Sequence, residues 1–430
     1  MQFIRIYQKP IHSMSTSSVT PRRAIIAFAL GALFFGYAFI QRVSPSVMTN
    51  ELMRDFAVGG AALGSLSAFY FYAYASIQLP VGMLTDRYGP RKLMSFAVGL
   101  CAIASVGFAF SDSILTASIG RALIGGTVAF AFVGTLAIAG YWFKPSQYAM
   151  LAGLLQSVGM SGAIFGQAPL RQVVESIGWR GTMGALGVLA VLLSIMLFVL
   201  VPHRTREQRN LKSGVGALGG LKSVASNSQT WLCAAIGFGM VAILLGFGSL
   251  WGVPWLNSVH GYTTLQAAGI VSMLFASWAI FSPLVGWLSD RIRRRNPIVI
   301  VGAIISVTSF TVVVFYTPES TALLMLMIFL TGLGGCSITV CFSSVKELNN
   351  LEYSSTALGL MNMCIVGAGA VMQPLIGWLL DMNWTGTIVD GARVYSASAY
   401  TTAFSSLLVV NVAALIGSLL LRETRCKQVV

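Results

Sequence analysis

Hydrophobic residues in this chain gather in long runs that short polar segments separate. Twelve of these runs hold about 20 mostly apolar residues, the length that an α-helix needs to cross the hydrocarbon core of a bilayer. The pattern therefore predicts an all-α polytopic membrane protein. The twelve predicted transmembrane helices cover residues 24–48, 62–84, 93–111, 114–140, 148–170, 182–201, 230–253, 264–288, 298–316, 320–343, 355–380 and 397–421.

The composition excludes a soluble domain. Hydrophobic residues make up 56% of the 430 residues, charged residues make up 9%, and the mean hydropathy is +0.78. Soluble domains carry charge on about a quarter of their residues, so this chain cannot cover a surface that faces water. The net charge of +14 needs no nucleic-acid partner, because excess Lys and Arg in a membrane protein usually marks its cytoplasmic loops.

The positions of Lys and Arg predict the orientation. If the N-terminus is cytoplasmic, 21 of the 27 basic residues fall in cytoplasmic segments. Four fall on the opposite side, namely Arg54, Arg171, Arg180 and Arg393. This asymmetry predicts that both termini are cytoplasmic and that the number of helices is even.

A polar stretch near the middle divides the chain. Residues 202–229 hold five Lys or Arg, four closely spaced Gly and few large apolar residues, a composition typical of a linker. The predicted parts are a cytoplasmic tail (1–23), a six-helix bundle (24–201), a cytoplasmic linker (202–229), a second six-helix bundle (230–421) and a cytoplasmic tail (422–430).

Short motifs recur in the two halves. The matched residues are Gly82 with Gly286 and Asp86 with Asp290, at an offset of 204, and Gln156 with Asn362 and Gln167 with Gln373, at an offset of 206. Two like halves of six helices indicate a secondary transporter whose site lies between the halves, near the midplane of the membrane.

These motifs carry a resemblance to a known family. The loop GMLTDRYGPRK (residues 82–92) resembles the signature loop between helices 2 and 3 of the major facilitator superfamily, and RALIGG (121–126) resembles its helix-4 motif. The resemblance covers nearly the whole chain and implies the MFS fold, two six-helix halves with inverted repeats. RVSPSVM (42–48), LMRDF (52–56) and the stretch 69–91 also resemble bacterial relatives of the lysosomal dipeptide transporter. We therefore expect a protein of the bacterial inner membrane.

The resemblance also implies roles for the two signature loops. Asp86 is expected to contact the N-terminus of helix 11 and Asp290 that of helix 5, and so to latch the halves on the cytoplasmic side. A carboxylate beside a helix N-terminus is stabilising by up to about 2 kcal/mol. The residues assigned to conformational gating are Gly82, Asp86, Arg87, Gly89, Arg91, Gly286, Asp290 and Arg291. The arginines position these acids or meet lipid phosphates, and Gly89 permits the tight turn. The alternative is a basic loop that only sets the topology.

Two arginines, Arg42 and Arg121, lie inside predicted helices, whereas all thirteen acidic residues fall in loops, tails or helix ends. An arginine at mid-bilayer costs at least about 2.5 kcal/mol. At 1.5 Å per residue, Arg42 lies about 27 Å along helix 1 and Arg121 roughly 10 Å into helix 4, so both belong to the outer half. We expect the pair to bind a substrate carboxylate, which guanidinium groups hold bidentately. The alternative is a structural arginine bonded to backbone carbonyls, above all for Arg121.

Other polar and aromatic residues complete the predicted substrate site. Tyr70, Tyr74 and Gln78 share one face of helix 2, because they are spaced by four. The remaining candidates are Gln156, Trp251, Asn362 and Gln373. Each has an ordinary alternative: helix packing for the helix 2 face, the bilayer interface for the tryptophan, and bonds among themselves for the amides.

The predicted function is alternating-access transport of a small carboxylate-bearing solute, such as an amino acid, short peptide or organic acid. The helix 1 and helix 4 arginines resemble those of organic-anion symporters, which usually have an acid beside the first and another in helix 4. Here Gln41 and residues 125–128 offer none, which favours a uniporter or exchanger. A proton-coupled symporter and an exporter of a drug or siderophore remain alternatives.

Rival classes of protein fit less well. A receptor would not need two gating loops, and an intramembrane enzyme would need a nucleophile, base or metal cluster in a span. We therefore predict no catalytic residue, metal or cofactor. The expected partners are an anionic or zwitterionic small molecule and the lipid bilayer, without nucleic acid, and the protein is expected to be a monomer.

Overall fold

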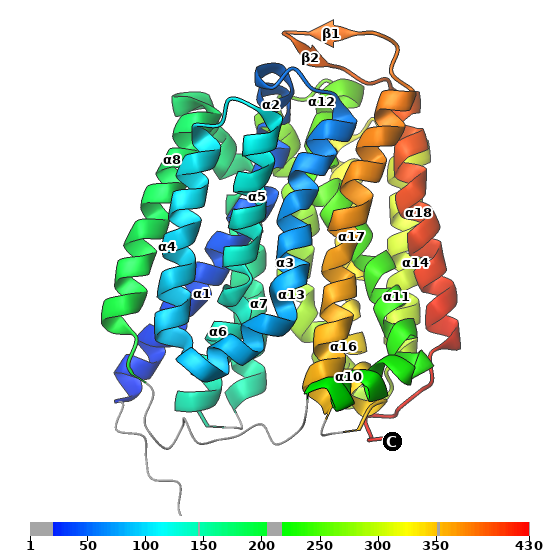
Figure 1. Ribbon diagram of the computed structural model, residues 1–430. Helices are drawn as coiled ribbons and strands as arrows, with labels where there is room; N and C mark the ends of the chain where they lie inside the picture. Colours follow the sequence, from blue (N-terminus) through cyan, green and yellow to red (C-terminus); the bar gives the residue numbers. More distant parts are fainter. Residues whose placement is uncertain (1–19, 145–146, 204–216, 351–352, 430) are drawn as a thin grey trace, which may run out of the picture.

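The computed structural model describes residues 20–144, 147–203, 217–350 and 353–429. Its long helices run roughly side by side, and the start of α1 (Pro21–Val43) and the end of α18 (Ala397–Leu420) lie on the same side of the molecule (Figure 1). We call this side the terminal side. The opposite side, which carries the strands β1 (Ile388–Val389) and β2 (Ala392–Arg393), is the distal side. The predicted N-terminal tail falls almost wholly outside the described residues.

The first half of the chain forms six spans, several of which join two elements across a short break. Its elements are α1 with the 3₁₀ turn η1 (Ser44–Val47), the short α2 (Thr49–Asp55), α3 (Gly60–Tyr88), α4 (Pro90–Ala109), α5 (Ile114–Val128), α6 (Phe130–Trp142), α7 (Tyr148–Phe165) and α8 (Ala168–Leu200). Helix α8 contains the end of the fifth span and all of the sixth. At Gly178 its backbone has φ 72° and ψ 167°, a conformation that glycine adopts easily, and the chain turns back there.

The second half repeats this arrangement. Its elements are α11 (Ser228–Ile243), the π-helical turn η3 (Leu244–Trp251), α12 (Gly252–His260), α13 (Thr264–Ile292), α14 (Asn296–Thr311), the π-helical turn η4 (Val312–Tyr316), α15 (Thr321–Gly335), α16 (Ile338–Glu347), α17 (Ser354–Met382) and α18. A short helix, α10 (Ala217–Ser226), lies in the predicted linker. The strands β1 and β2 pair antiparallel in the loop before α18.

The helices account for twelve spans. Ten segments are by themselves long and apolar enough to cross a membrane. Helix α3 supplies the eleventh, although the short α2 bends away from it by 112°. The apolar part of α7 continues into the first turns of α8 and supplies the twelfth. The predicted fold class is therefore confirmed: the chain folds as two six-helix halves.

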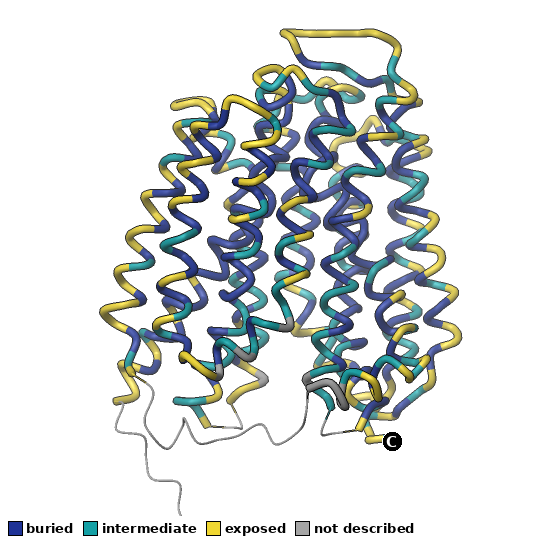
Figure 2. The backbone as a smooth tube through the Cα atoms, in the orientation of Figure 1, coloured by how far each residue is buried: buried dark blue, intermediate teal, exposed yellow. Residues whose placement is uncertain are grey.

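Burial distinguishes the inside of the bundle from its rim. Buried residues fill the middle, while exposed residues follow the outer faces of the peripheral helices (Figure 2). Large apolar side chains on those outer faces are strongly exposed, among them Phe96 at 70% and Leu420 at 68%. Helices satisfy their own backbone hydrogen bonds and can present such side chains to lipid. The protein is thus a multi-pass membrane protein.

Candidate functional site

Arg42 lies at the end of α1, where Pro45 has no N–H to continue the helix and the chain passes into η1. The residue is 8% exposed. Its Cζ lies 4.2 Å from the ring centre of Phe39, 5.3 Å from that of Tyr74 and 5.8 Å from that of Tyr70. Such cation–π contacts contribute about 0.5–2 kcal/mol each. Aromatic rings therefore surround this cation.

No acid balances the charge of Arg42 in the described part of the chain. The ion pairs there all use other arginines, and the Nε of Arg42 is buried without a hydrogen-bond partner among those residues. A buried cation in this situation calls for a counter-charge that the described residues do not supply.

Arg121 has a different environment, although it lies close by. The residue is fully buried, and its Nη1 donates a 2.7 Å hydrogen bond to the backbone carbonyl of Gln41. This carbonyl belongs to the last turn of α1, where carbonyls lack partners within the helix. The contact is the one that the structural interpretation of Arg121 predicts. Its Nε and Nη2 have no partner among the described residues.

Tyr70 connects the two arginines. Its ring centre lies 5.0 Å from the Cζ of Arg121 as well as beside Arg42, and its hydroxyl donates to the carbonyl of Ala38 on α1 at 3.1 Å. Tyr74 stacks on the same ring, with centres 6.1 Å apart. The structure thus brings four of the predicted substrate-site residues together where α1, α3 and α5 meet.

The other predicted site residues lie elsewhere. Gln78, Gln156 and Asn362 are half-buried on α3, α7 and α17, nearer the terminal side. Trp251 and Gln373 are fully buried. The indole of Trp251 donates to the carbonyl of Gln373 at 3.0 Å, and the Gln373 amide donates to a carbonyl of η3 at 2.7 Å. The last two therefore belong to a packed region in the distal part of the bundle.

The halves meet on the distal side through Asp381, which the sequence analysis did not assign to the site. Its carboxylate accepts hydrogen bonds from the backbone N–H groups of Gly60 at 3.0 Å and Ala61 at 2.8 Å, in the first turn of α3. The Tyr395 hydroxyl at 2.6 Å and the Arg393 guanidinium at 3.1 Å bind the same carboxylate. Burial raises the pKa of the Tyr395 hydroxyl, and the hydrogen bond to the negatively charged Asp381 raises it further. An acid of one half therefore caps a helix of the other.

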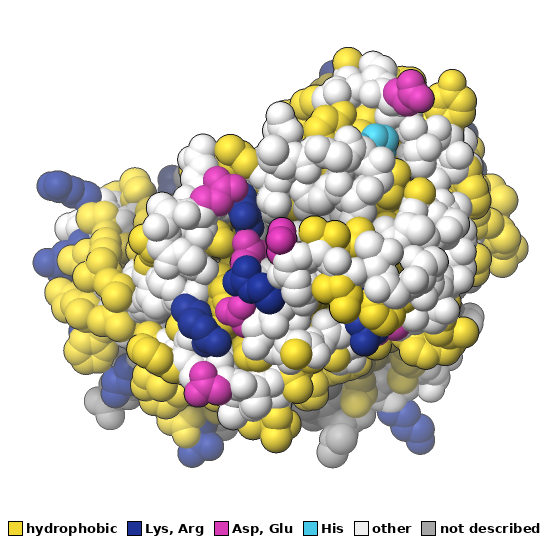
Figure 3. All heavy atoms as spheres, turned by 90° about the horizontal axis from the view of Figure 1, so that it is seen from above, with side chains coloured by type: hydrophobic (Ala, Val, Ile, Leu, Met, Phe, Trp, Pro, Cys, Tyr) yellow, Lys and Arg dark blue, Asp and Glu magenta, His cyan; other side chains and the backbone are white. Residues whose placement is uncertain are grey.

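Close backbone approach reinforces this contact. A Cβ added to Gly377 of α17 would lie 2.1 Å from the carbonyl oxygen of Gly60, so only glycine fits there. Gln167, predicted only as the repeat partner of Gln373, donates to the carbonyl of Gly248 in η3 at 3.1 Å. Charged side chains of both signs are interspersed on the distal face (Figure 3).

The first signature loop has no partner in the other half among the contacts described. Gly89 joins α3 to α4 with φ 81°, where a glycine is expected. The Arg87 guanidinium lies 5.3 Å from the ring centre of Tyr88, and that of Arg91 lies 4.9 Å from the ring centre of Phe198. The side chain of Asp86 lies outside the described residues, so its predicted latch stays a prediction.

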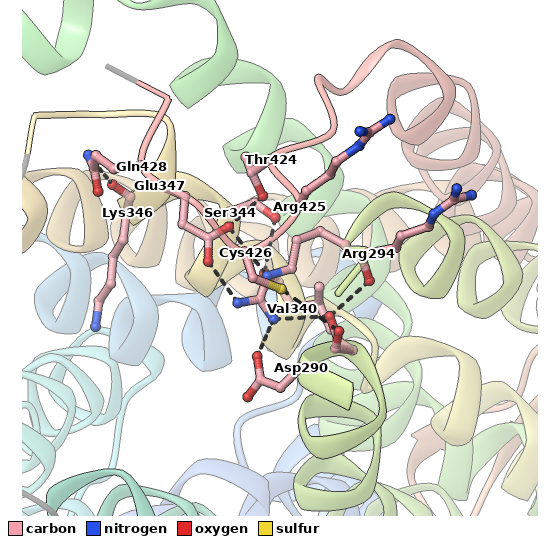
Figure 4. Close-up of polar contacts among 12 residues, drawn as sticks. Asp290, Arg294, Val340, Ser344, Lys346, Glu347, Thr424, Arg425, Cys426 and Gln428 are labelled. Atoms are coloured by element: carbon pink, nitrogen blue, oxygen red, sulfur yellow. Dashed lines mark hydrogen bonds and ion pairs between the residues drawn. The ribbon is translucent and has the colours of Figure 1, made fainter. Parts of the chain in front are cut away.

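The second signature loop is bound within its own half. Asp290 was predicted to cap helix 5, but here its carboxylate accepts from Arg295 at 2.6 Å. Arg295 also donates to Glu347 at 2.7 Å, which ties the loop to the end of α16 (Figure 4). Arg291 instead lies over Trp287, at 5.2 Å from the ring centre.

The repeated glycines Gly82 and Gly286 have open space beside them. A Cβ added to either would meet no atom of the described residues within 4 Å.

Comparisons with known proteins agree with this architecture. Residues 26–374 match the profile of the Major Facilitator Superfamily. The chain is 24% identical to the probable sulfoacetate transporter SauU of Cupriavidus necator, over 88% of this chain and 93% of that protein. It is 25% identical to the multidrug resistance protein Stp of Mycobacterium tuberculosis, over 83% and 76% of the two chains.

A solved structure shows the same fold. It is a bacterial homologue of the human lysosomal transporter Spinster in an inward-facing, unoccupied conformation, with a TM-score of 0.76 and 17% identity, over 95% of this chain and 98% of that one. By the match over most of its length, this chain belongs to the Major Facilitator Superfamily and is a membrane transporter, not an enzyme.

Proposed function

We propose that this protein moves a small organic anion across the membrane by alternating access, with Arg42 binding the acidic group of the solute. Suitable solutes are organic acids, amino acids and short peptides. Arg42 carries the proposal, because it is a nearly buried cation that no described acid neutralises. A substrate carboxylate offsets that unfavourable charge and takes two parallel hydrogen bonds from the guanidinium.

The surroundings of Arg42 support a solute with a small apolar body. Phe39, Tyr70 and Tyr74 present ring faces to the guanidinium and restrict how an anion approaches it. Arg121 acts as a positioning residue, since its bond to Gln41 fixes the last turn of α1. The name of SauU adds support, because sulfoacetate is a small organic dianion.

We propose uniport or exchange as the mode of transport. Proton symport would need a titratable acid near the substrate. Two acids, Glu51 and Asp55, follow α1, and both already have partners. Glu51 forms an ion pair with Arg171 at 2.6 Å. Asp55 pairs with Arg54 at 3.0 Å and accepts a hydrogen bond from the Trp179 indole at 2.8 Å. Following the excess of basic residues, we assign the terminal side to the cytoplasm and the membrane to the bacterial inner membrane.

A second candidate is export of an apolar or cationic drug, which the relative Stp favours by its name. The aromatic rings around Arg42 would suit such a solute, but the arginine itself would not. The two candidates differ in what Arg42 does: anion transport needs its charge, and drug export is hindered by it.

Ligand-induced thermal stabilisation of the purified full-length protein tests the proposal. The ligands are organic acids, amino acids, dipeptides, neutral sugars and cationic dyes, and the variants are Arg42→Ala, Arg42→Lys and the control Arg180→Gln. A ligand at 100 times its Kd stabilises by about 2.7 kcal/mol, so acidic ligands should raise the Tm of the native protein and the control.

We expect Arg42→Ala to abolish the acidic-ligand shift and Arg42→Lys to retain part of it, because lysine keeps the charge but loses the bidentate geometry. Uptake of the identified anion into proteoliposomes should then depend on Arg42 in the same order. Stabilisation by neutral sugars or dyes alone, unchanged in Arg42→Ala, would overturn the proposal.

A further inference from the structure

The first span of each half is interrupted at a corresponding place. In the first half, the α-helix gives way to the 3₁₀ turn η1 just after Arg42, and in the second half it gives way to the π-helical turn η3. The repeat offset of 204 relates residues 44–47 of η1 to residues 248–251, which lie in η3. The two turns pack against each other across the boundary between the halves. Irregular helical turns of this kind are frequent at functional sites.

Gln167 binds both turns. The residue is fully buried at the junction of α7 and α8. Its Nε2 donates to the carbonyl of Gly248 in η3 at 3.1 Å, and its Oε1 accepts from the hydroxyl of Ser46 in η1 at 3.3 Å. A backbone carbonyl can only accept, so the amide nitrogen is the atom that must face Gly248. One side chain therefore joins the turn that follows Arg42 to the opposite half.

Gln373, the repeat partner of Gln167, is the internal comparison. Its amide also donates to a carbonyl of η3, that of Leu245 at 2.7 Å, but this bond stays within the second half. Its Oε1 is buried without a partner among the described residues, and the hydroxyl of Ser249 in η3 donates to the carbonyl of Leu244 at 3.1 Å. The matching glutamine thus binds the turn of its own half. The fold of one half does not require an amide that reaches across to the other.

The bond between Gln167 and Gly248 depends on how the halves are arranged. Alternating access separates the halves on the distal side during part of the transport cycle. When η1 and η3 move apart, this hydrogen bond must break, whereas the bond between Gln167 and Ser46 lies within one half and can persist. The first bond is therefore a contact of the state that is closed on the distal side.

We propose that Gln167 is a positioning residue for transport, which holds η1 against η3 while the distal side is closed. Its bond to Gly248 stabilises that state, and breaking the bond releases η1, with Arg42 before it, from the second half. Binding at Arg42 and closure of the distal side are thereby coupled. This coupling rests on the proposed role of Arg42 in binding the solute, whereas the contact itself does not.

The test measures the separation of the halves in the full-length protein, reconstituted in lipid nanodiscs without ligand. Spin labels are attached to Asp112→Cys and Glu319→Cys, which replace exposed acids in distal loops of opposite halves, in a background without other cysteines. Double electron–electron resonance then gives the populations of short and long distances between the labels. Because no ligand is present, the result does not depend on the proposed solute.

Three variants separate the cross-half contact from general stability. Gln167→Leu removes both bonds of the amide at similar volume, and Ser46→Ala removes only the partner in η1. The matched control is Asn411→Leu. Asn411 is also a fully buried amide, and it donates to the carbonyl of Gly239 on α11 at 3.2 Å, but within the second half.

We expect Gln167→Leu to raise the ratio of long to short distances by about 3- to 10-fold, the effect of losing one buried hydrogen bond. Asn411→Leu should lower the Tm but leave this ratio unchanged, because its bond is the same in both states. Ser46→Ala should raise the ratio by a smaller factor, since it frees the amide to turn away from Gly248. It should add nothing in the Gln167→Leu background, because both changes act through one side chain.

Three results overturn the proposal. They are an unchanged ratio in Gln167→Leu, an equal rise in Asn411→Leu, and a further rise when Ser46→Ala is added to Gln167→Leu. A lower Tm without a change in the distances would mean that Gln167 has only a structural role. If Gln167→Leu does not fold, Ser46→Ala decides the question alone, and an unchanged ratio in that variant overturns the proposal.

Discussion

The distal and terminal sides of the molecule hold their charged residues in different ways. On the distal side, Asp381 of the second half bonds the first turn of α3 in the first half, at 2.8 and 3.0 Å. On the terminal side, Asp290 and Glu347 bind Arg295 within one half. These contacts of the described residues thus join the halves at one end and stabilise a single half at the other.

This difference indicates which state of the transport cycle the structure represents. Alternating access requires the halves to close on one side of the substrate while they separate on the other. The distal contacts close that side. On the terminal side, Asp290 of the second signature loop pairs with Arg295 of its own half and not with a residue of the other half. We infer a conformation that is closed on the distal side; with the orientation proposed above, this conformation is inward-facing.

The largest expected effect comes from breaking the glycine contact of the distal side. In Gly377→Leu, the new side chain would collide with the backbone of Gly60, and overpacking of this kind typically costs 1–3 kcal/mol or more. The population in which the halves are separated distally should rise by a factor of about 5 to 150. The readout is maleimide labelling of Ser46→Cys, which lies in η1 and is 1% exposed, in a background without other cysteines.

Gly367 provides the matched control on the same helix. A Cβ added there meets no atom within 4 Å, so Gly367→Leu should leave the labelling rate unchanged. Equal labelling in the two variants would show that the glycine contact does not hold the distal side closed.

A smaller effect is expected from Asp381→Asn. The amide keeps the shape of the side chain and an acceptor oxygen but loses the charge that four donors share. A hydrogen bond to a charged group is worth about 1.5–3 kcal/mol and one to a neutral group about 0.5–1.5 kcal/mol, so the expected loss is about 1 kcal/mol. Labelling of Ser46→Cys should rise severalfold, less than in Gly377→Leu. The control is Asp390→Asn, an exposed acid of the adjacent strand loop. A rise in both variants would point to the net charge of this face and not to the cap.

The sequence predicts the distal contacts poorly and the spans well, for a physical reason. A span needs about 20 apolar residues in a row, which is a local property that hydropathy reveals. Asp381 and Gly60 are 321 positions apart, and their contact exists only after two independent bundles dock. Nothing near either residue marks the other.

Arg42 and Arg121 show the same limit within one half. Their unusual charge in apolar helices was visible in the sequence, and the structure places both beside Tyr70. Arg121, and not Arg42, donates to the carbonyl of Gln41, because α5 packs against the end of α1. The sequence pattern could not predict which of the two arginines makes this contact. Hydropathy likewise could not predict the π-helical turn η3. Its carbonyls accept hydrogen bonds from the side chains of Gln167 and Gln373.

The smallest effect concerns the C-terminal tail on the terminal side. Glu423 accepts from the backbone N–H groups of Arg295 and Asn296, both at 3.0 Å, and of Arg425 at 2.9 Å. Burial raises the pKa of this carboxyl, but the backbone hydrogen bonds outweigh it and hold the pKa below its ordinary value of 4.5. The tail is therefore fastened to the start of α14 by an ionised group.

The direction of the pH dependence follows from the lowered pKa. The contribution of Glu423 is complete above its ordinary value and is lost as the pH falls through the lowered value. The Tm of Glu423→Gln should therefore lie slightly below that of the native protein at pH 6 to 8, and the two should converge as the pH falls below 4.5. Glu319→Gln, in an exposed distal loop, should show no such difference. The described contacts of the tail all lie in the second half, so distal labelling of Ser46→Cys should not change in Glu423→Gln. A rise would mean that the terminal-side contacts also control closure at the distal side, and the contrast between the two ends would fail.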